Sequence, residues 1–364
     1  MTTGEGDRSA HVTHADSSHA DPGHRASEGP TSITGLGPHG EFAASVEQLQ
    51  ISDEAAAMAA KAGYTVALVL HTTRSDWSKL QVAGVRATLE RYGASITDVI
   101  DCDFQAKRQI EALESLVENR PDAVISIPVD NRLTTDAHRR LAQAGVRLVL
   151  MDNAPVGMLP GKDYVSVISA DNFGNGEVAA EILSGYVPES GSVGIVGFGV
   201  DFFVTNEREI AFRKWMKERR PDITLRHAAF TDIDRAGDLA VDLLAAHRDI
   251  DGLFVVWDEP ATEVTHALAE SGRYVPVTTI DLGDLAAAEI ARGGLIKGVG
   301  AQRPYDQGVA EAMAAIMALV GGEPPPWIAL PGLSVTRENV IEAYESVWHI
   351  PAPRELQTAI EPAT

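Results

Sequence analysis

Six residues able to bind a small polar ligand stand at, or directly after, the ends of predicted β-strands: His71, Asp130, Asp152, Trp257, Asp281 and Gln302. Open α/β sheets bind their ligands beyond the carboxyl ends of the strands. Each residue alone is equally well explained as the N-cap of a following helix. Asp130 is explained better that way, because helix signals follow it closely. Together, and drawn from both halves of the chain, the six predict a ligand cleft between two domains.

The side chains of this set match the chemistry of a polyhydroxylated ligand. Carboxylates accept hydrogen bonds, and an amide both donates and accepts. An anionic ligand would instead have to face the aspartates. Trp77 and Trp257 also follow strand ends. An indole commonly lies in a core, but at loop mouths these two favour stacking on the C–H surface of a sugar or polyol.

Sequence motifs of common enzymes are missing. The chain has no nucleophile elbow, no HExxH and no P-loop lysine motif. The segment GIVGFG at 194–199 lacks the GxGxxG spacing and a ribose-binding acid about twenty residues further on. Cys102 is the single cysteine, which excludes an internal disulfide and a cysteine-rich metal site. We therefore predict no catalytic turnover, no metal and no cofactor.

Charge excludes further classes of protein. The formal net charge of −22 over 364 residues argues against general binding to nucleic-acid backbones or anionic membranes. No apolar run reaches the roughly 18 to 20 residues of a membrane helix. The first residues also lack the pattern of a secretion signal.

Strand and helix patterns alternate along most of the chain, which predicts parallel sheets with helices on both faces. The buried strand 64–70 ends in the loop 71–76, and Trp77 opens a helix. The other predicted strands are 95–101, 123–129, 146–151, 164–170, 192–198, 224–230, 252–257, 276–280, 295–300 and 327–335. The other predicted helices are 105–119, 134–144, 206–219, 235–247, 260–271, 285–293 and 305–320.

This series predicts an α/β protein of two doubly wound parallel-sheet domains. Residues 1–40 are poor in aliphatic side chains and are predicted to be a disordered tail. Residues 41–63 are predicted to form a leading helical segment and 351–364 a loose tail.

Eight segments, in order along the chain, resemble the type I periplasmic sugar-binding proteins of the ribose-binding group. The opening strand and loop ALVLHTTRSDWSKLQVAG, the strands DAVISIPVD and LVLMDN, and the crossing ISADNFGNGEVAA cover the first half. The segments TNEREIAF, FVVWDEPA, TTIDLGD and GVGAQRPYDQG cover the second half. The resemblance spans residues 64 to about 340 and implies the periplasmic binding protein type I fold, in which a three-crossing hinge near Ala170, Gln302 and Leu333 joins the two domains. It further implies an N-terminal lobe of residues 64–170 and 303–333 and a C-terminal lobe of residues 171–302 and 334–350.

The resemblance also implies roles for individual residues. Asp152, Arg208, Asp281 and Gln302 would hydrogen-bond the ligand hydroxyls, and Trp77 would stack on the ligand. Three residues depart from the ribose pattern: Asn153 replaces an arginine, Trp257 an asparagine and Ser78 a second aromatic residue. These changes favour another neutral monosaccharide or a short sugar alcohol over ribose. The predicted ligand-binding set is His71, Trp77, Asp130, Asp152, Asn153, Arg208, Trp257, Asp281 and Gln302.

The resemblance further implies a monomeric, extracytoplasmic solute receptor that closes around its ligand and delivers it to the membrane permease of an ABC importer. How such a chain would be exported, or whether translation starts at Met1, stays open. The same fold also serves as the effector domain of sugar-responsive transcriptional regulators, but residues 1–60 show no DNA-binding headpiece. A nucleotide-cofactor enzyme is a weaker alternative.

Overall fold

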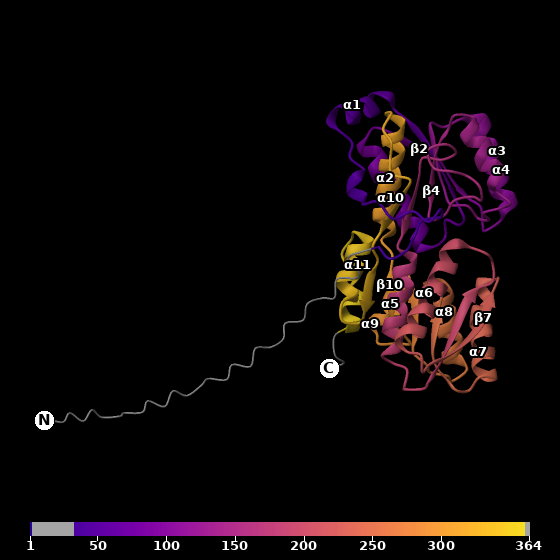
Figure 1. Ribbon diagram of the computed structural model, residues 1–364, viewed down its shortest axis with the longest axis vertical. Helices are drawn as coiled ribbons and strands as arrows, with labels where there is room; N and C mark the ends of the chain where they lie inside the picture. Colours follow the sequence, from indigo (N-terminus) through magenta and orange to yellow (C-terminus); the bar gives the residue numbers. More distant parts are fainter. Residues whose placement is uncertain (2–32, 361–364) are drawn as a thin grey trace.

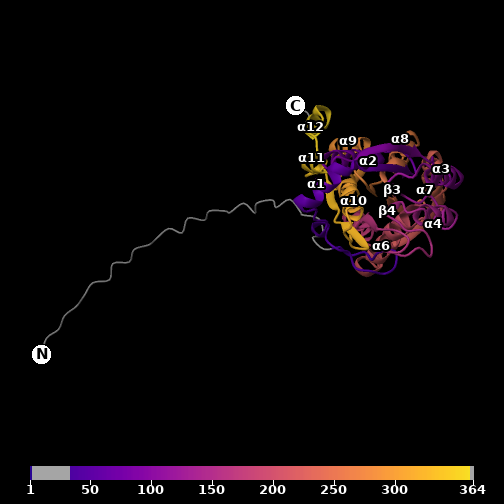
Figure 2. The same ribbon diagram turned by 90° about the horizontal axis from the view of Figure 1, so that it is seen from above.

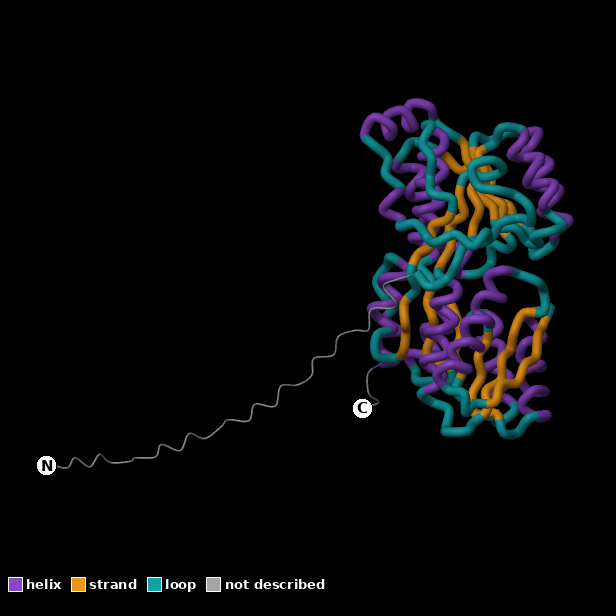
Figure 3. Tube along the Cα trace, in the orientation of Figure 1, coloured by secondary structure: helices purple, strands orange, loops and turns teal. Residues whose placement is uncertain are grey.

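The computed structural model describes Met1 and residues 33–360. Residues 33–360 form two lobes stacked along the long axis (Figure 1). Each lobe has a central sheet with helices on both faces (Figure 3). The predicted fold class is confirmed. The part of the predicted disordered tail at 2–32 and the last four residues of the predicted loose tail lie outside the described residues.

The N-terminal lobe contains a six-stranded parallel sheet in the order β11-β5-β4-β3-β1-β2. Its strands are β1 (Thr65–Leu70), β2 (Ser95–Asp101), β3 (Ala123–Ser126), β4 (Arg147–Met151), β5 (Ser166–Ala170) and β11 (Trp327–Leu330). Its helices are α1 (Asp53–Ala62), α2 (Asp76–Arg91), α3 (Ala106–Asn119), α4 (Thr135–Gln143) and α10 (Pro304–Leu319), preceded by the 3-10 turn η1 (Val46–Gln48). Seen from above, α1, α2 and α10 lie on one side of the strands, and α3 and α4 lie on the other (Figure 2).

The C-terminal lobe contains a second six-stranded sheet in the order β12-β10-β9-β8-β6-β7. Its strands are β6 (Ser192–Phe198), β7 (Thr224–Phe230), β8 (Ile250–Val255), β9 (Val277–Ile280), β10 (Ile296–Ala301) and the antiparallel edge strand β12 (Leu333–Thr336). Its helices are α5 (Asn172–Ser184), α6 (Phe203–Arg219), α7 (Ala236–Ala246), α8 (Asp258–Glu270), α9 (Asp284–Ala291), α11 (Val340–Trp348) and α12 (Arg354–Ile360), with the 3-10 turn η2 (Ile233–Arg235) before α7.

Burial explains why the strands read as continuous apolar runs. Val66 to Leu70 of β1 are completely buried, because helices cover both faces of a parallel sheet. The two faces of this sheet contribute to two separate apolar cores: Leu68 faces the core beneath α2 and α10, and Val69 faces the core beneath α3 and α4. These cores fix the strand ends from which the ligand site is built.

Three chain crossings join the lobes. They run from β5 to α5, from β10 to α10 and from β11 to β12. The third crossing is tightly packed, since a Cβ atom at Gly332 would collide with the Asn175 side chain. These positions correspond to the hinge predicted near Ala170, Gln302 and Leu333.

Residues 33–44 form a strap beside the hinge, with a turn at 38–40, which corrects the prediction of disorder for 33–40. The amides of Thr34 and Gly35 donate to the Asp171 carboxylate at 2.8 and 3.0 Å. Asp171 also caps α5, the first helix of the C-terminal lobe. At the other end, Ala44 forms a parallel bridge to Ile328 of β11 in the N-terminal lobe. The strap therefore contacts both lobes.

The C-terminal segment is also better ordered than predicted. Residues 354–360 form α12, which packs against α9, and Leu356 and Ala352 are buried in the core of the C-terminal lobe. The prediction of a loose tail is therefore wrong for this segment, because its few apolar residues find a core to join. Among the described residues, no helix has the length and apolar character needed to cross a membrane.

Candidate ligand-binding site

A cavity of about 70 Å³ lies between the lobes, at the carboxyl ends of the strands. Its walls combine polar and aromatic side chains from both lobes. The lining residues are His71, Ser75, Trp77, Phe104, Ile127, Asp152, Phe198, Phe202, Val204, Thr205, Arg208, Trp257, Asp258, Glu259, Asp281 and Gln302. Seven of the nine predicted ligand-binding residues are in this list.

Asp152 follows β4 in the N-terminal lobe and is almost completely buried. Its backbone is left-handed, with φ of 56°, and its amide donates to Ile168 O at 2.7 Å. The carboxylate accepts from Ser169 Oγ at 2.9 Å and weakly from the Ala170 amide at 3.4 Å. Burial raises the pKa of Asp152 to about 6, against the lowering effect of the Ser169 hydroxyl. Asp152 is thus a buried carboxyl group that ionises, and becomes a hydrogen-bond acceptor at both oxygens, as the pH rises through about 6.

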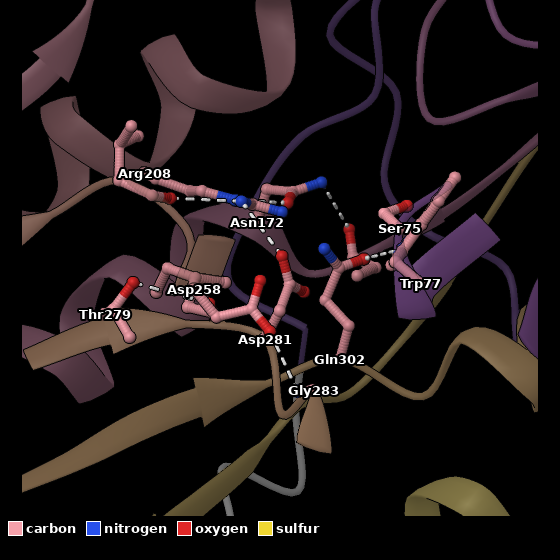
Figure 4. Close-up of polar contacts among 12 residues, drawn as sticks. Ser75, Trp77, Asn172, Arg208, Asp258, Thr279, Asp281, Gly283 and Gln302 are labelled. Atoms are coloured by element: carbon pink, nitrogen blue, oxygen red, sulfur yellow. Dashed lines mark hydrogen bonds and ion pairs between the residues drawn. The ribbon is translucent and has the colours of Figure 1, made fainter. Parts of the chain in front are cut away.

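Arg208, on α6, is the buried cation of the site (Figure 4). Its Nε donates to Asn172 Oδ1 at 3.0 Å, and Nη1 donates to the Val256 carbonyl at 3.1 Å. Nη1 also lies 3.5 Å from Asp281 Oδ2, a long ion pair. These three partners hold the planar guanidinium in one orientation, which suits directional donation to a ligand.

Asp281 follows β9 in the C-terminal lobe and is also left-handed, with φ of 75°. Its Oδ1 is buried and has no hydrogen-bond partner among the described residues. Burial raises the pKa of Asp281, and the Arg208 guanidinium opposes that rise. A buried acceptor without a partner is costly, so a ligand hydroxyl at this oxygen would remove the cost.

Gln302 and Trp77 meet across the hinge. The indole Nε1 of Trp77 donates to Gln302 Oε1 at 3.3 Å, which fixes the orientation of the Gln302 amide (Figure 4). Trp77 is the second residue of α2 in the N-terminal lobe, and Gln302 follows β10 of the C-terminal lobe. Because Trp77 occupies the amide oxygen of Gln302, the Nε2 amino group of Gln302 remains as a hydrogen-bond donor in the site.

His71 forms part of an aromatic cluster on the N-terminal side of the cavity. Its ring lies edge-on to Trp77 at 5.4 Å and to Phe104 at 4.8 Å between ring centroids. Burial lowers the pKa of His71 to about 4, although the Asp101 carboxylate opposes the shift. The imidazole is therefore neutral at pH 7. Its buried Nδ1 has no partner among the described residues and is free to hydrogen-bond a hydroxyl.

Two of the predicted residues do not line the cavity. Asp130 lies four residues beyond the end of β3, and its Oδ1 accepts from the amides of Arg132 and Leu133 in its own turn. Asn153 contacts Asn131 and the Ala154 amide instead of the cavity. We leave both out of the proposed site.

The apolar part of the lining, chiefly Phe104, Phe198 and Phe202, is absent from the ligand-binding set predicted from the sequence. Phe198 is the last residue of β6 and Phe104 lies three residues after β2. Both rings thus stand at strand ends, the same signal that the polar and indole residues of the site carry in the sequence.

Acidic groups continue from the cavity to the lobe boundary. The Asp258 carboxylate accepts from the Gly283 amide at 2.8 Å (Figure 4), and burial together with Asp281 raises the pKa of Asp258 well above its ordinary value. Nearby, Asp76 of α2 accepts from the Asp284 amide at 3.1 Å. Asp284 opens α9, whose N-cap residue Gly283 supplies no capping side chain. An aspartate of one lobe thus partly caps a helix of the other.

The arrangement suits recognition of hydroxyl groups. Carboxylate oxygens, a fixed guanidinium and a fixed amide surround the polar part of the cavity, and charge-assisted hydrogen bonds are the strong kind. Ser75 Oγ donates to Ser78 Oγ at 2.9 Å and is not paired with a base. Within residues 33–360, no group of three or more His, Cys, Asp or Glu side chains is placed to hold a metal ion.

Comparison with known proteins places this geometry in context. A family model described as a periplasmic binding protein domain matches residues 66–324. The ribose import binding protein of Bacillus subtilis is 25% identical over 232 residues, which covers 63% of this chain and 73% of the relative. The D-ribose/D-allose-binding protein of Pseudomonas aeruginosa is 20% identical over 265 residues, or 71% and 83% of the two chains.

Solved structures show the same fold. An ABC transporter solute-binding protein of Agrobacterium vitis, bound to α-D-tagatopyranose, matches with a TM-score of 0.73 and 22% identity, covering 80% of this chain and all of that one. A solute-binding protein of Mycobacterium smegmatis with bound glycerol matches with a TM-score of 0.70 and 21% identity, covering 76% and 96%.

Proposed function

We propose that this chain, which belongs to the periplasmic binding protein domain family, is the solute receptor of an ABC importer and binds a neutral sugar or sugar alcohol. The observation that carries the proposal is the convergence of Asp152, Arg208, Asp281 and Gln302 on one interlobe cavity beside Trp77. The protein acts by binding and release, as receptors of this family do, and not by turnover.

The polar groups divide the work of recognition. Asp152 and Asp281 accept from ligand hydroxyls, while Arg208 and Gln302 donate to ligand oxygens. Trp77 covers an apolar C–H face of the ligand. The names of the relatives agree with this class, since they include binding proteins for ribose, allose and tagatose, and one structure contains glycerol.

Binding on both sides of the hinge couples the ligand to lobe closure. Asp152 belongs to the N-terminal lobe, whereas Arg208 and Asp281 belong to the C-terminal lobe. A ligand that bonds to both sides stabilises the closed arrangement, and the three crossings absorb the motion. The closed receptor then docks, as a monomer, on the permease at the outer side of the membrane.

A thermal-shift screen tests the proposal. The panel contains pentoses, hexoses, tetritols, pentitols, hexitols and inositols, with amino acids and nucleosides as controls. A ligand at a hundred times its dissociation constant should stabilise the fold by about 2.7 kcal/mol, a clear upward shift of Tm. Mass spectrometry of the best ligand after long incubation should show it unchanged. Stabilisation by amino acids or nucleosides alone, or conversion of the ligand, would contradict the proposal.

A further inference from the structure

Two cavities meet at the mouth of the cleft. The inner cavity of about 70 Å³ is the proposed ligand site, and an outer groove of about 840 Å³ lies beside it. Five residues line both spaces: Phe104, Phe198, Trp257, Asp258 and Glu259. Three of these are aromatic, and they come from both lobes. The boundary between the two spaces is therefore formed largely by rings.

The rings on the C-terminal side are held by packing. Trp257 lies edge-on to Phe198, with ring centroids 5.3 Å apart and an interplanar angle of 87°. It also packs on Phe230 at 5.3 Å, and Phe198 packs on Phe230 at 5.6 Å. Edge-to-face contacts at these distances are favourable. Because the three rings support one another, Trp257 cannot swing aside without disrupting its neighbours.

The ring on the N-terminal side is held by an unusual backbone. Asp103 and Phe104 both have left-handed conformations, with φ of 50° and 53°. Such conformations are uncommon for non-glycine residues and are a real outlier for a bulky one. The Phe104 amide donates to the His71 carbonyl at 2.7 Å, and the two rings meet edge-on. Backbone strain of this kind concentrates at functional sites.

Phe104 is only partly buried in this position. The residue is 38% exposed, although phenylalanine is usually buried. A strained backbone that presents a partly exposed ring at the mouth of a ligand cavity is better explained by a contact with the ligand, or by exclusion of part of it, than by fold stability.

We propose that Phe104, Phe198 and Trp257 form an aromatic gate that determines the largest ligand the inner cavity accepts. This inference rests on the proposed function and narrows its ligand class to single monosaccharides and short polyols. A glycoside or disaccharide would have to pass its second group between the rings into the outer groove. Phe104 and Trp257 are thus specificity-determining residues.

Calorimetric titration of matched small and large probes tests the gate. The probes are D-ribose, D-glucose and D-galactose, each against its phenyl β-glycoside, and xylitol against lactitol. The unmodified protein should bind at least one small probe at least tenfold more tightly than its larger partner. Phe104→Ala should reduce that ratio below about threefold, and Phe104→Trp should keep or increase it. Phe42→Ala is the matched control, because Phe42 is 88% exposed and lies in the strap.

The outcomes separate the two proposals. The gate is overturned if a small probe binds but Phe104→Ala does not change the ratio of small-probe to large-probe affinity. The proposed sugar receptor is unaffected by that result. Equal binding of small and large probes by the unmodified protein also overturns the gate. A protein that binds none of the eight probes, while amino acids or nucleosides stabilise it, overturns the proposed function and the gate with it.

Discussion

Asp152 and Asp281 occupy equivalent positions in the two lobes, directly after β4 and β9, and both have left-handed backbones with φ of 56° and 75°. Strain of this kind costs on the order of 1–3 kcal/mol per residue and persists where the surrounding structure enforces it. The Asp152 and Asp281 amides are engaged by Ile168 O and Gly300 O, which helps to fix both turns. The fold thus holds two carboxylates at one cavity before a ligand arrives.

Replacing Asp281 by Asn should weaken sugar binding about 10- to 150-fold, because a hydrogen bond to a charged group contributes about 1.5–3 kcal/mol. The unliganded protein should keep its Tm or gain slightly, since Oδ1 of Asp281 has no hydrogen-bond partner among the described residues. Titration calorimetry and thermal unfolding measure the two effects. Asp130→Asn is the control and should bind normally; equal losses in both variants would remove Asp281 from the site.

Arg208→Lys should impair both binding and stability. A lysine cannot reproduce the bonds from Nε to Asn172 and from Nη1 to Val256, and it leaves a buried carbonyl unpaired. We expect affinity to fall at least tenfold and the midpoint of urea unfolding to decrease. Arg292→Lys is the matched control, because Arg292 is exposed and pairs with Glu289 on the surface. A normal affinity of Arg208→Lys would contradict the assigned role.

Sugar affinity should rise with pH through about 6. Burial raises the pKa of Asp152 to about 6, so the carboxylate that accepts ligand hydroxyls is lost as the pH falls below this value. The charged groups acting on Asp152 are Arg208 and Asp281, and Asp152 in turn helps to raise the pKa of the buried Glu311. One pH unit below the pKa, affinity should be about tenfold weaker.

The contribution of Asp152 to the stability of the unliganded fold should change with pH in the opposite direction to sugar affinity. Because the folded-state pKa of Asp152 lies above its ordinary value of 3.8, its contribution to stability is present below about pH 4 and is lost as the pH rises through 6. Asp152→Asn removes the titration, so its weaker binding should vary less between pH 5 and 7. An unaltered pH profile in this variant would assign the titration to another group.

Asp76→Ala should weaken binding without touching the cavity. Asp76 Oδ2 accepts from the Asp284 amide at 3.1 Å, a contact that joins the two lobes and would be lost if they moved apart. Losing a helix cap costs about 0.5–2 kcal/mol, so we expect a 2- to 30-fold loss of affinity. X-ray scattering of the liganded variant should show a larger radius than the liganded unmodified protein. Asp53→Ala, at the exposed start of α1, is the control.

The strand ends were the predictable part of the site. A buried apolar run that stops at a polar residue marks the carboxyl edge of a parallel sheet, and this rule placed Asp152, Asp281 and Gln302 correctly at the cavity. It failed for Asp130, because β3 ends at Ser126 and the chain turns away before residue 130. Whether the lining residues contact a ligand stays a prediction.

Other features depend on contacts that a local pattern does not contain. The position of Phe104 in the gate depends on the left-handed backbone conformations of Asp103 and Phe104. The sequence DCDFQ around them does not predict these conformations. The strap at 33–44 combines Ile33, Leu36 and Phe42 with small and polar residues, and its Thr34 and Gly35 amides donate to Asp171, more than 130 positions away in the chain. Composition alone predicted disorder there, because it cannot include a distant acceptor.

The strap has a mechanical consequence for any motion of the lobes. Its Thr34 and Gly35 amides are fastened to Asp171, beside the first crossing, and Ala44 is fastened to β11, which leads into the third. Atoms close to a hinge move least when two domains rotate about it, so both sets of contacts can persist during rotation of the lobes. Force applied through the chain ahead of residue 33 would accordingly load the pivot and not the rim of either lobe. The cleft would stay free to open while the protein is pulled or tethered from that end.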